Sequence, residues 1–457
     1  MALSQGILQR IRTIMLRFGM FRFGPPGGRM ISRRRFVQFG ALAATALPSV
    51  SLKAADQPCA ALPPSIANLK SMKGQATPIT NGERRARQER ARRLMAEQRI
   101  DAIVLTEGTS LIYFSGIRWW GGERLFAMVL TAKGAPFYVC PAFEEGRARE
   151  QIAQGLNADQ PDIRRWQEDE DPYERVEQGL MDHGIATGTL GIEETVRYVF
   201  SSGIAKAAPQ ATIVSATPVT AGCRMIKSDH EVALMRLAAK VTLVVYEAAY
   251  RSLKEGMTKS DLENLIAAAY DRVGFPGEAD VQIDQNTAFP HGSASSQVVR
   301  EGSIIMLDDG CLVEGYTSDI TRTFTFGKPN DKMKKVFDIV HRAQTEAVKT
   351  ARPGLQCQAV DAAARKVIVE GGYGPDYKYF THRLGHGMGM DGHEWPYLVP
   401  GNKLALAANM TFSDEPGIYI RDEFGIRLED DMHITEDGAE LFTSQSVSLE
   451  DPFGKTT

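Results

Sequence analysis

The stretch MLDDGCLVEGYTSDITRTF (residues 306–324) constrains the fold more than any other part of the chain. Two apolar, strand-like runs, SIIML and TSDITRTFTF, are joined by the short segment CLVEG, which predicts a β-hairpin. If Val313 and Glu314 form the turn, Asp308 and Asp319 lie opposite each other on one face of the ribbon. Like charges at opposed positions destabilise a sheet. The hairpin therefore predicts that a cation lies between the two carboxylates.

The whole chain has 457 residues, of which 43% are hydrophobic and 24% charged. This is the composition of an ordinary water-soluble protein, too long for one typical domain, so we expect two domains. The net charge of −3 hides an asymmetry, because residues 1–55 contain nine basic and no acidic residues, and −3 minus 9 leaves −12 for the rest. An acidic body argues against a nucleic acid or an anionic membrane as partner.

Residues 1–55 are predicted to be an export signal. The run SRRRFVQFG is followed by the apolar ALAATALPSVSLKAA, which ends in the small residues Ala54 and Ala55 that suit a signal peptidase. This arrangement resembles a twin-arginine signal, which implies passage through the twin-arginine export machinery, a periplasmic location and no stable membrane anchor after cleavage. The apolar run, at about 15 residues, is too short to span a bilayer. A basic helix that stays on the protein and a start at Met30 remain as alternatives.

Residues 56–82 contain proline and glycine and are predicted to be a linker, and residues 83–225 to be an α/β domain. In that domain a charged helix, RRARQERARRLMAEQ, precedes a strand at 102–105, and the strand-like LFAMVLT and PFYVC precede the helical EEGRAREQIAQGL. Because glutamates interleave with the arginines, a solvated helix face is favoured over a polyanion site. No catalytic spacing occurs in this half of the sequence.

The five cysteines give no framework, since their number is odd and no CxxC spacing is present. Neither a set of disulfides nor a zinc knuckle is therefore indicated. The cysteines are Cys59, Cys140, Cys223, Cys311 and Cys357.

Residues 226–457 begin with a long amphipathic helix and then show a weak repeat. EGMTKSDLENLIAAAYDRVGF and PGLQCQAVDAAARKVIVEGGY align at an offset of 98 residues, which pairs Gly256 with Gly354 and Gly274 with Gly372. Each copy reads as a turn, an amphipathic helix and a glycine stop, followed by a strand-rich block. The pattern predicts a duplicated supersecondary unit.

Further polar residues lie on apolar strand patterns in the second copy. RLGHGMGMDGHEWP contains His386 and His393, MTFSDEPGIYI contains Glu415, and GIRLEDDMHI contains Glu429. Any one of them could be an ordinary hydrogen-bonded or solvated residue. Buried together with the two aspartates, they would form a like-charge cluster that is untenable without compensating cations.

These motifs, the two aspartates eleven residues apart, GHGMG, DEPGIY and GIRLED, resemble those of the pita-bread metallopeptidases, which include methionine aminopeptidase, aminopeptidase P and prolidase. The resemblance covers about residues 228–440. The preceding domain resembles the amino-terminal domain of the aminopeptidase P, prolidase and creatinase branch. The implied fold class is α+β, with a C-terminal pita-bread (creatinase/aminopeptidase-like) fold after an α/β creatinase-type N-terminal domain.

The resemblance implies two divalent metal ions per chain. Asp308 would bind one ion, His386 and Glu415 the other, and Asp319 and Glu429 would bridge both. Oxygen ligands with a single imidazole suit Mn²⁺, Co²⁺ or Zn²⁺ without selecting among them.

Four further residues receive roles from the same resemblance. His291, seventeen residues before Asp308, and His393 would hold the substrate and the developing oxyanion. Arg427, two residues before Glu429, would brace the bridging carboxylate or meet a substrate carboxylate. For His382, a role next to the metal ligands and a packing role stay open.

The implied activity is that of an exported Xaa-Pro dipeptidase or aminopeptidase P acting on dipeptides or short peptides, in a homodimer. A hydroxide bridging the two metals would attack the carbonyl before proline, and Glu415 would pass its proton to the leaving nitrogen. Two departures bear on the substrate. Asp284 stands where relatives keep a glycine, and Gly277 and Glu278 lie near where some relatives carry an aromatic residue.

Three alternatives remain at this point. The first is a hydrolase or lyase of the same fold that acts on a non-peptide small molecule, although the metal-free creatine hydrolases lack these carboxylates and the lyases shift their spacing. The second is a non-catalytic pita-bread binding module, which would be expected to lose ligands. The third is a structural Ca²⁺ site, which the histidine and the absence of a calcium-loop spacing disfavour.

Overall fold

The structure, a computed structural model, describes residues 61–454 except 157–159, 294 and 296. The predicted export signal, the alternative start Met30 and Cys59 lie outside the described residues. The chain from Leu62–Thr457 forms one compact unit. In the described ranges, no helix is both long enough and apolar enough to cross a bilayer.

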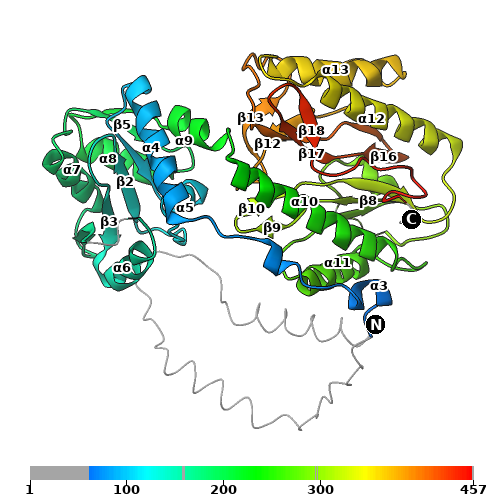
Figure 1. The fold of residues 1–457 in the computed structure, drawn as a ribbon, viewed down its shortest axis with the longest axis horizontal. Coiled ribbons are helices and arrows are strands. Elements are labelled where there is room, and N and C mark those ends of the chain that lie inside the picture. Colours follow the sequence, from blue (N-terminus) through cyan, green and yellow to red (C-terminus); the bar gives the residue numbers. More distant parts are fainter. Residues whose placement is uncertain (1–60, 157–159, 294, 296, 455–457) are drawn as a thin grey trace, which may run out of the picture. The chain divides into compact units, whose positions relative to one another are not determined.

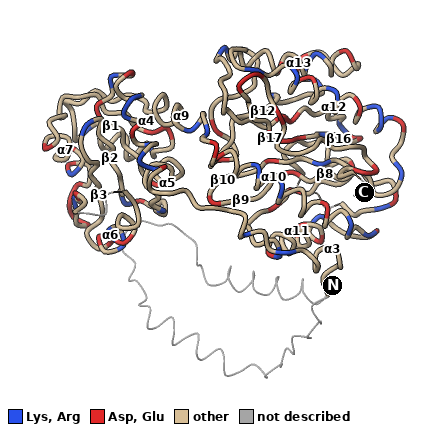
Figure 2. Tube along the Cα trace, in the orientation of Figure 1, with Lys and Arg blue, Asp and Glu red and all other residues tan. Residues whose placement is uncertain are grey.

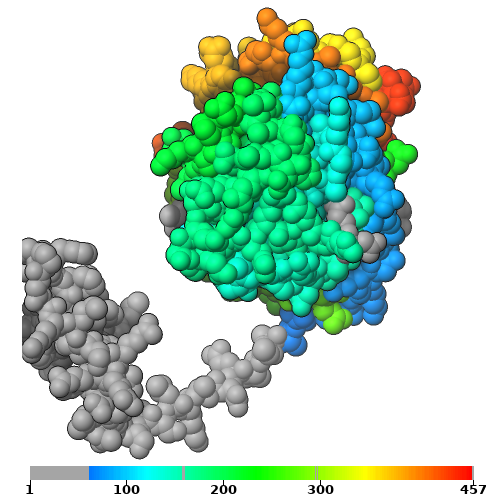
Figure 3. Space-filling view, turned by 90° about the vertical axis from the view of Figure 1, so that its left-hand side faces the viewer, coloured from blue at the N-terminus to red at the C-terminus, as the bar shows by residue number. Residues whose placement is uncertain are grey.

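In the described residues, the first half contains a mixed six-stranded sheet with helices on both faces (Figure 1). Figure 3 shows the surface of this half, coloured from blue to green. The strand order is β4-β3-β2-β1-β5-β6, in which β2 runs antiparallel to β1 and β3. Alternate residues of β1 enter two different cores, Ile103 the one under α4, α5, α6 and α9, and Val104 the one under α7 and α8. The strands are β1 Ala102–Leu105, β2 Ala127–Thr131, β3 Phe137–Pro141, β4 Asp162–Trp166, β5 Thr189–Ile192 and β6 Thr212–Ser215. The helices are α4 Asn81–Gln98, α5 Thr109–Ser115, α6 Glu145–Ala153, α7 Pro172–Asp182, α8 Tyr198–Ala207 and α9 Thr217–Arg224.

Helix α4 confirms the predicted charged helix but corrects the interpretation of its arginines. The helix starts at a capping box between Thr80 and Glu83, and its basic and acidic side chains are interspersed (Figure 2). Arg87, however, is buried and lies 3.1 Å from the carboxylate of Glu231 and 2.6 Å from the hydroxyl of Tyr316. This face of α4 therefore contacts the second half of the chain and is not solvated.

The described part of the predicted linker is packed against the second half of the chain. It contains α3 (Pro64–Ala67) and a 3₁₀ turn (Lys73–Gln75), and Ile66, Met72 and Ile79 are buried in the core that α10 and α11 share. The described part of the predicted linker is therefore packed, because its apolar side chains lie against a hydrophobic surface.

The second half consists of strands that lie between two helix pairs, α10 with α11 and α12 with α13 (Figure 1). The first pair packs on β7, β8 and β11, and the second on β13 to β17. The helices are α10 Asp229–Tyr250, α11 Lys259–Val273, α12 Asp331–Thr350 and α13 Cys357–Glu370. The strands are β7 Asp280–Ile283, β8 Ile304–Asp308, β9 Leu312–Val313, β10 Tyr316–Thr317, β11 Arg322–Thr325, β12 Gly385–Gly387, β13 Glu394–Leu398, β14 Thr411–Asp414, β15 Gly417–Ile420, β16 Phe424–Arg427, β17 Asp430–Ile434 and β18 Ala439–Leu441.

The predicted repeat is confirmed at the level of single residues. The offset of 98 residues maps Lys259, the first residue of α11, onto Cys357, the first residue of α13. All four paired glycines have positive φ, which an L side chain adopts only with strain. The φ angles are 88° and 83° for Gly256 and Gly354, and 88° and 93° for Gly274 and Gly372. The two helical units therefore have glycines with positive φ at equivalent positions before and after a helix of similar length, 15 residues in α11 and 14 in α13.

The hairpin at 304–325 is present, but its predicted register is wrong by two residues. Tyr316 pairs with Val313, and Arg322 pairs with Leu307, so the two-residue turn consists of Glu314 and Gly315. Both turn residues have positive φ, 51° and 93°, as a type I′ turn requires. Continuing this register places Thr321, and not Asp319, opposite Asp308. A shift of two residues keeps each side chain on its face, because side chains alternate with a period of two.

Candidate metal centre

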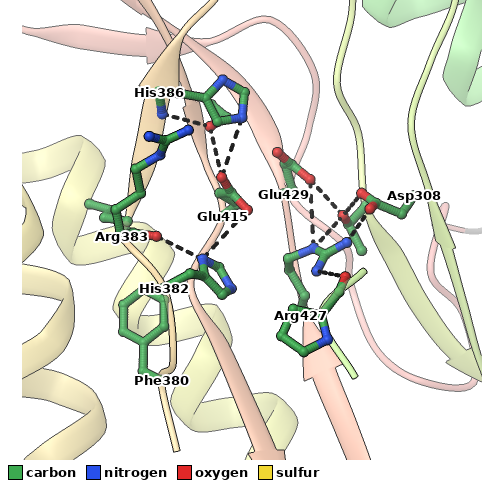
Figure 4. A network of polar contacts seen from close by, with 12 residues as sticks. Asp308, Phe380, His382, Arg383, His386, Glu415, Arg427 and Glu429 are labelled. Atoms are coloured by element: carbon green, nitrogen blue, oxygen red, sulfur yellow. Dashed lines mark hydrogen bonds and ion pairs between the residues drawn. The ribbon is translucent and has the colours of Figure 1, made fainter. Parts of the chain in front are cut away.

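Five acidic and histidine side chains from both duplicated units converge at one place, which we call the metal centre. Their ligand-capable atoms lie within 4.8 Å of one another in overlapping groups of three. One group is Asp308, Asp319 and Glu429, another is His386, Glu415 and Glu429, and a third joins Asp319, His386 and His393. Figure 4 shows Glu415 between His386 and His382, with Asp308 and Glu429 on the side of Arg427. The structure thus brings together all five residues to which the sequence assigned metal binding.

Short strands and close backbone approach position His386. It is the central residue of β12, which lies between β13 and β14. A Cβ on Gly385 would collide with the carbonyl oxygen of Ser413, and one on Gly387 would lie 2.6 Å from the carbonyl oxygen of Glu394. The amide of His386 donates to Ser413 Oγ at 3.1 Å. The glycines flanking His386 therefore allow the tight fit that the GHGMG motif predicts.

The imidazole of His386 provides a direct test of whether a cation fits. Its Nδ1 lies 3.2 Å from the carbonyl oxygen of Gly387, which can only accept, so the ring proton resides on Nδ1. Nε2 then presents a lone pair to Glu415 Oε1 at 3.4 Å and to Asp319 Oδ2 at 3.7 Å. Burial lowers the pKa of His386 to about 3, so the ring does not take up a second proton that could bind these two carboxyl groups. A metal ion among these three atoms would bind all of them, and the donor set suits one.

The other side of the metal centre is acidic and already holds one cation. Arg427 is buried and forms an ion pair with Asp308, and its Nε lies 3.9 Å from Glu429 Oε2. Burial, followed by the charges of neighbouring carboxylates, raises the pKa values of Asp319 and Glu429 well above their ordinary values. One guanidinium therefore leaves the four carboxylates undercompensated, and further positive charge would be stabilised here.

Thr321 is a central residue of the site that the sequence reasoning missed. Its Oγ1 lies 2.5 Å from Asp308 Oδ1 and 2.6 Å from Glu429 Oε2, and it accepts a hydrogen bond from Arg427 Nε at 2.9 Å. The wrong register hid it, since only a turn at Glu314–Gly315 places Thr321 opposite Asp308. The preference of type I′ turns for glycine at the second central position was the available signal.

His382 lies behind the metal centre in a defined hydrogen-bonded chain. Its Nδ1 donates to the carbonyl of Arg383 at 2.7 Å, so its Nε2 accepts from the hydroxyl of Tyr419 at 2.7 Å, which in turn accepts from Arg427 at 3.1 Å. Burial and the charge of Arg427 lower the pKa of His382 to about 3, which keeps the ring neutral. Its Nδ1 is 3.8 Å from Glu415. His382 thus supports the ligand-bearing strands, and Tyr419 is a second residue that the sequence reasoning missed.

Glu415 is a ligand candidate that lies between His382 and His386. Burial, opposed by Arg427 and reinforced by Asp308, raises its pKa to about 7. Its Oε1 accepts from Ser413 Oγ at 3.3 Å, which leaves Oε2 on the side of His382.

A cavity of about 400 Å³ opens onto the metal centre and contains His291 and His393 in its wall. The His393 ring stacks on the ring of His386, with centroids 3.7 Å apart, and its Nδ1 lies 3.2 Å from Arg383. The full lining is Pro290, His291, Asp308, Asp319, His382, Arg383, His386, His393, Glu415, Arg427 and Glu429. All residues with predicted catalytic or metal-binding roles therefore face one cavity.

The two predicted departures also receive a structural account. Asp284 has a φ of 51°, a conformation that favours glycine, and its carboxylate accepts from Ser303 Oγ at 3.1 Å and from the amide of Ile304 at 3.2 Å. Asp284 therefore anchors the start of β8. Gly277 and Glu278 line a neighbouring cavity of about 480 Å³ that also contacts Asp319.

Comparison with known families divides the chain in two. Residues 233–436 match the model of metallopeptidase family M24, and residues 87–226 match the model of the creatinase/prolidase N-terminal domain. The first match contains all five residues of the metal centre.

Curated relatives and solved structures agree with these matches. The probable dipeptidase PepE of Mycobacterium tuberculosis is 36% identical over 347 residues, 75% of this chain and 90% of that protein. The Xaa-Pro dipeptidase of Lactobacillus delbrueckii subsp. lactis is 30% identical over 362 residues, 78% of this chain and 96% of that protein. Among solved structures, the dipeptidase PepE of Mycobacterium ulcerans is 32% identical, covers 82% of this chain and 99% of its own, and superposes with a TM-score of 0.76.

Proposed function

Because the chain belongs to metallopeptidase family M24, we propose that it hydrolyses the peptide bond before proline in Xaa-Pro dipeptides or short peptides, with two divalent ions at the metal centre. The chain is a metallopeptidase, and the predicted α+β fold, a pita-bread domain after a creatinase-type N-terminal domain, is confirmed. The proposal concerns the bond, the number of ions and the roles of single residues.

The proposal rests on the close approach of His386 Nε2 to the carboxyl oxygens of Asp319 and Glu415. A neutral imidazole nitrogen lies within 4 Å of two buried carboxyl groups, next to a group of acids that Arg427 alone does not neutralise. In the proposed arrangement, Asp308 would hold one ion, His386 and Glu415 would hold the other, and Asp319 and Glu429 would be ligands shared by the two. When bound, the ions would polarise the scissile carbonyl and acidify a water molecule.

The remaining roles follow from position. Glu415 is buried next to the proposed ion position with its Oε2 on the side of His382, and it would pass a proton to the leaving nitrogen. His291 and His393 line the open side of the cavity, where they would donate to the substrate carbonyl as negative charge develops on it. Arg427 is buried against Asp308 and Thr321, which favours the bracing role over contact with a substrate carboxylate.

The choice of an Xaa-Pro substrate is supported by the Lactobacillus relative, which is an Xaa-Pro dipeptidase, and the two dipeptidases named above support a dipeptide substrate. A cavity of about 400 Å³ is large enough for a short peptide.

The test uses residues 56–457, purified and analysed for bound metals. We expect hydrolysis of Xaa-Pro dipeptides, weaker hydrolysis of longer Xaa-Pro peptides, and little hydrolysis of matched peptides with alanine in place of proline. Equal rates on the alanine controls would remove the prolyl preference, and a metal-loaded chain inactive on every peptide would contradict the peptidase proposal. Gel filtration of the same sample tests the predicted homodimer.

Export through the twin-arginine pathway is a separate proposal, which the motif SRRRFVQFG supports. Arg33→Lys with Arg34→Lys should retain the protein in the cytoplasm with its signal uncleaved. The matched control is Arg10→Lys with Arg12→Lys, outside the motif, which should leave export unchanged. Periplasmic recovery of the motif variant at the level of the control would refute the pathway.

A further inference from the structure

The loop that carries His393 is held by two charged residues at the boundary between the two halves, Arg224 and Lys227. Glu394, directly after His393, is buried, and its two carboxylate oxygens contact two different cations. Lys227 Nζ lies 2.7 Å from Glu394 Oε1, and Arg224, the last residue of α9, forms an ion pair with Glu394 Oε2. The side chains of Lys227 and Glu394 are 2% and 7% exposed, so water screens this pair little.

The same arginine also reaches the other side of His393. Arg224 Nη2 lies 2.5 Å from Asp391 Oδ2, and the hydroxyl of Thr109, the first residue of α5, donates to Asp391 Oδ1. Two carboxylates that flank His393, at positions 391 and 394, are therefore bound by one guanidinium. Asp391 and Glu394 are therefore both held by residues outside the sheet that contains β13.

A further contact links this loop to the hairpin of the metal centre. The carbonyl oxygen of Gly389 accepts from the amide of Thr317 at 2.7 Å, two residues before Asp319. His393 itself is exposed, and its described contacts are the stacking on His386 and the approach of Arg383. The orientation of an exposed ring depends on its backbone, and here the backbone is held through Asp391 and Glu394.

We propose that Arg224 and Lys227 are positioning residues that hold His393 over the metal centre by binding the carboxylates on either side of it. This inference rests on the proposed role of His393 toward substrate. Displacement of a reacting group by about 1 Å can cost about 10²-fold in rate, so a change at Arg224 acts on the reaction without touching substrate or metal. The first half of the chain thereby contributes to catalysis through one loop.

Arg224→Gln is the principal test, with Asp391→Asn as a milder variant of the same contact. We expect Arg224→Gln to lower kcat about 10- to 10²-fold with an unchanged metal content, because His393 is proposed to act in the transition state. The matched control is Arg236→Gln, which breaks an exposed ion pair with Glu440 and should leave kcat unchanged.

A double-mutant comparison separates positioning from general damage to the fold. In a His393→Ala background, Arg224→Gln should lower kcat by less than about twofold, since the residue through which it acts is gone. An equal loss in both backgrounds, or no loss in the native background, overturns the proposal. If Arg224→Gln does not fold, Asp391→Asn is subjected to the same comparison with the same criteria.

A readout without substrate distinguishes this inference from the proposed function. In metal-loaded protein with ¹³C-labelled histidine, the His393 resonance is assigned by its loss in His393→Ala. Arg224→Gln should shift or broaden it, whereas Arg236→Gln should not, and an unchanged resonance in Arg224→Gln overturns the positioning role. If the parent chain hydrolyses no peptide, the proposed function fails while this measurement still decides the contact.

Discussion

The two duplicated units of the second half share one scaffold and carry different chemistry. Helices α11 and α13 start at equivalent positions, and each is followed by a glycine with positive φ, Gly274 and Gly372, at equivalent positions. The first unit supplies only carboxylates, Asp308 and Asp319, whereas the second supplies His386 with Glu415 and Glu429. The scaffold is thus symmetric and the ligand set is not, so the two proposed ion positions differ in kind.

The electrostatics of the two sides follow from that difference. On the carboxylate side, the buried Arg427 already compensates Asp308. On the imidazole side, His382 and His386 are neutral, because burial lowers the pKa of each to about 3. A cation on the imidazole side therefore meets an uncharged nitrogen donor, and one on the carboxylate side meets only oxygen. The predictions below perturb the shared ligand, then each side, then the charge balance.

The largest expected effect comes from Asp319, which contacts both sides. Asp319→Asn should lose metal occupancy and activity together, because the amide cannot neutralise two ions. Metal analysis of the purified variant, beside its rate on an Xaa-Pro dipeptide, checks this. The matched control is Asp309→Asn, a neighbouring acid outside the three ligand groups, which should retain its metals. Full metal content with normal turnover in Asp319→Asn would remove the bridging assignment.

Alanine variants of the two stacked histidines should lose activity for different reasons. His393→Ala should keep its metals and lose about 10²–10³ in kcat, as after loss of an oxyanion donor. His386→Ala should weaken the imidazole side, so that excess Mn²⁺ or Co²⁺ partly restores both occupancy and rate.

Metal analysis and rates measured over a metal titration distinguish the pair. His393→Ala should not be rescued by added metal. If His393→Ala were emptied and His386→Ala fully loaded, the two roles would be reversed.

A smaller effect is expected on the carboxylate side at Thr321. Thr321→Val keeps the shape but removes the hydroxyl that contacts Asp308, Glu429 and Arg427. We expect a fall of about tenfold in kcat/KM, the equivalent of one lost hydrogen bond to charged groups. Thr321→Ser, which retains the hydroxyl, is the control and should stay near the parent. Equal rates for Thr321→Val and the parent would show that the hydroxyl does not orient these ligands.

The smallest effect is the pH dependence of stability in metal-free protein. The folded pKa of Glu415 is about 7 against an ordinary value of 4.5, and those of Asp319 and Glu429 are raised as well. Groups with raised folded pKa values stabilise the protein below their unfolded pKa, and this stability is lost as pH rises through the folded values. Between the unfolded and folded pKa values, each proton that only the folded protein retains lowers the free energy of unfolding by about 1.4 kcal/mol per pH unit.

The melting temperature of metal-free protein should therefore fall as the pH rises from about 6.5 through about 7, the folded pKa of Glu415, with Asp319 and Glu429 acting in the same direction. The buried histidines oppose this only below their ordinary pKa of 6.5. Metal-loaded protein should show a smaller fall, because the ions keep the carboxylates ionised. A metal-free melting temperature that rises over this interval would contradict the charge assignment.

The sequence was sufficient to predict which acidic and histidine side chains converge, and insufficient for the residues that support them. Proposed ligands such as His386 lie in short motifs with fixed spacing, which local sequence identifies. Thr321 was missed because the turn was placed one residue too early, which moved the register by two. Local patterns indicate that a hairpin is present more reliably than they indicate which residues of its two strands pair.

Contacts between distant segments left no local signal at all. Arg87 reads as a surface arginine of a charged helix, yet it pairs with Glu231 far along the chain. Arg224 and Glu394 are separated by 170 positions, and neither lies in a recognisable motif for the other. The burial of both pairs is decided by how the two halves pack, which periodicity within one helix cannot predict.

The central claim is that one chain holds two ions through ligands of two kinds. Calorimetric titration of metal-free protein (residues 56–457) with Mn²⁺, with dipeptide hydrolysis followed in parallel, tests it most directly. The account predicts two equivalents bound per chain, with full activity reached at the second, and fewer equivalents for Asp319→Asn. Saturation of both binding and activity at one equivalent, or full activity without bound metal, would contradict it.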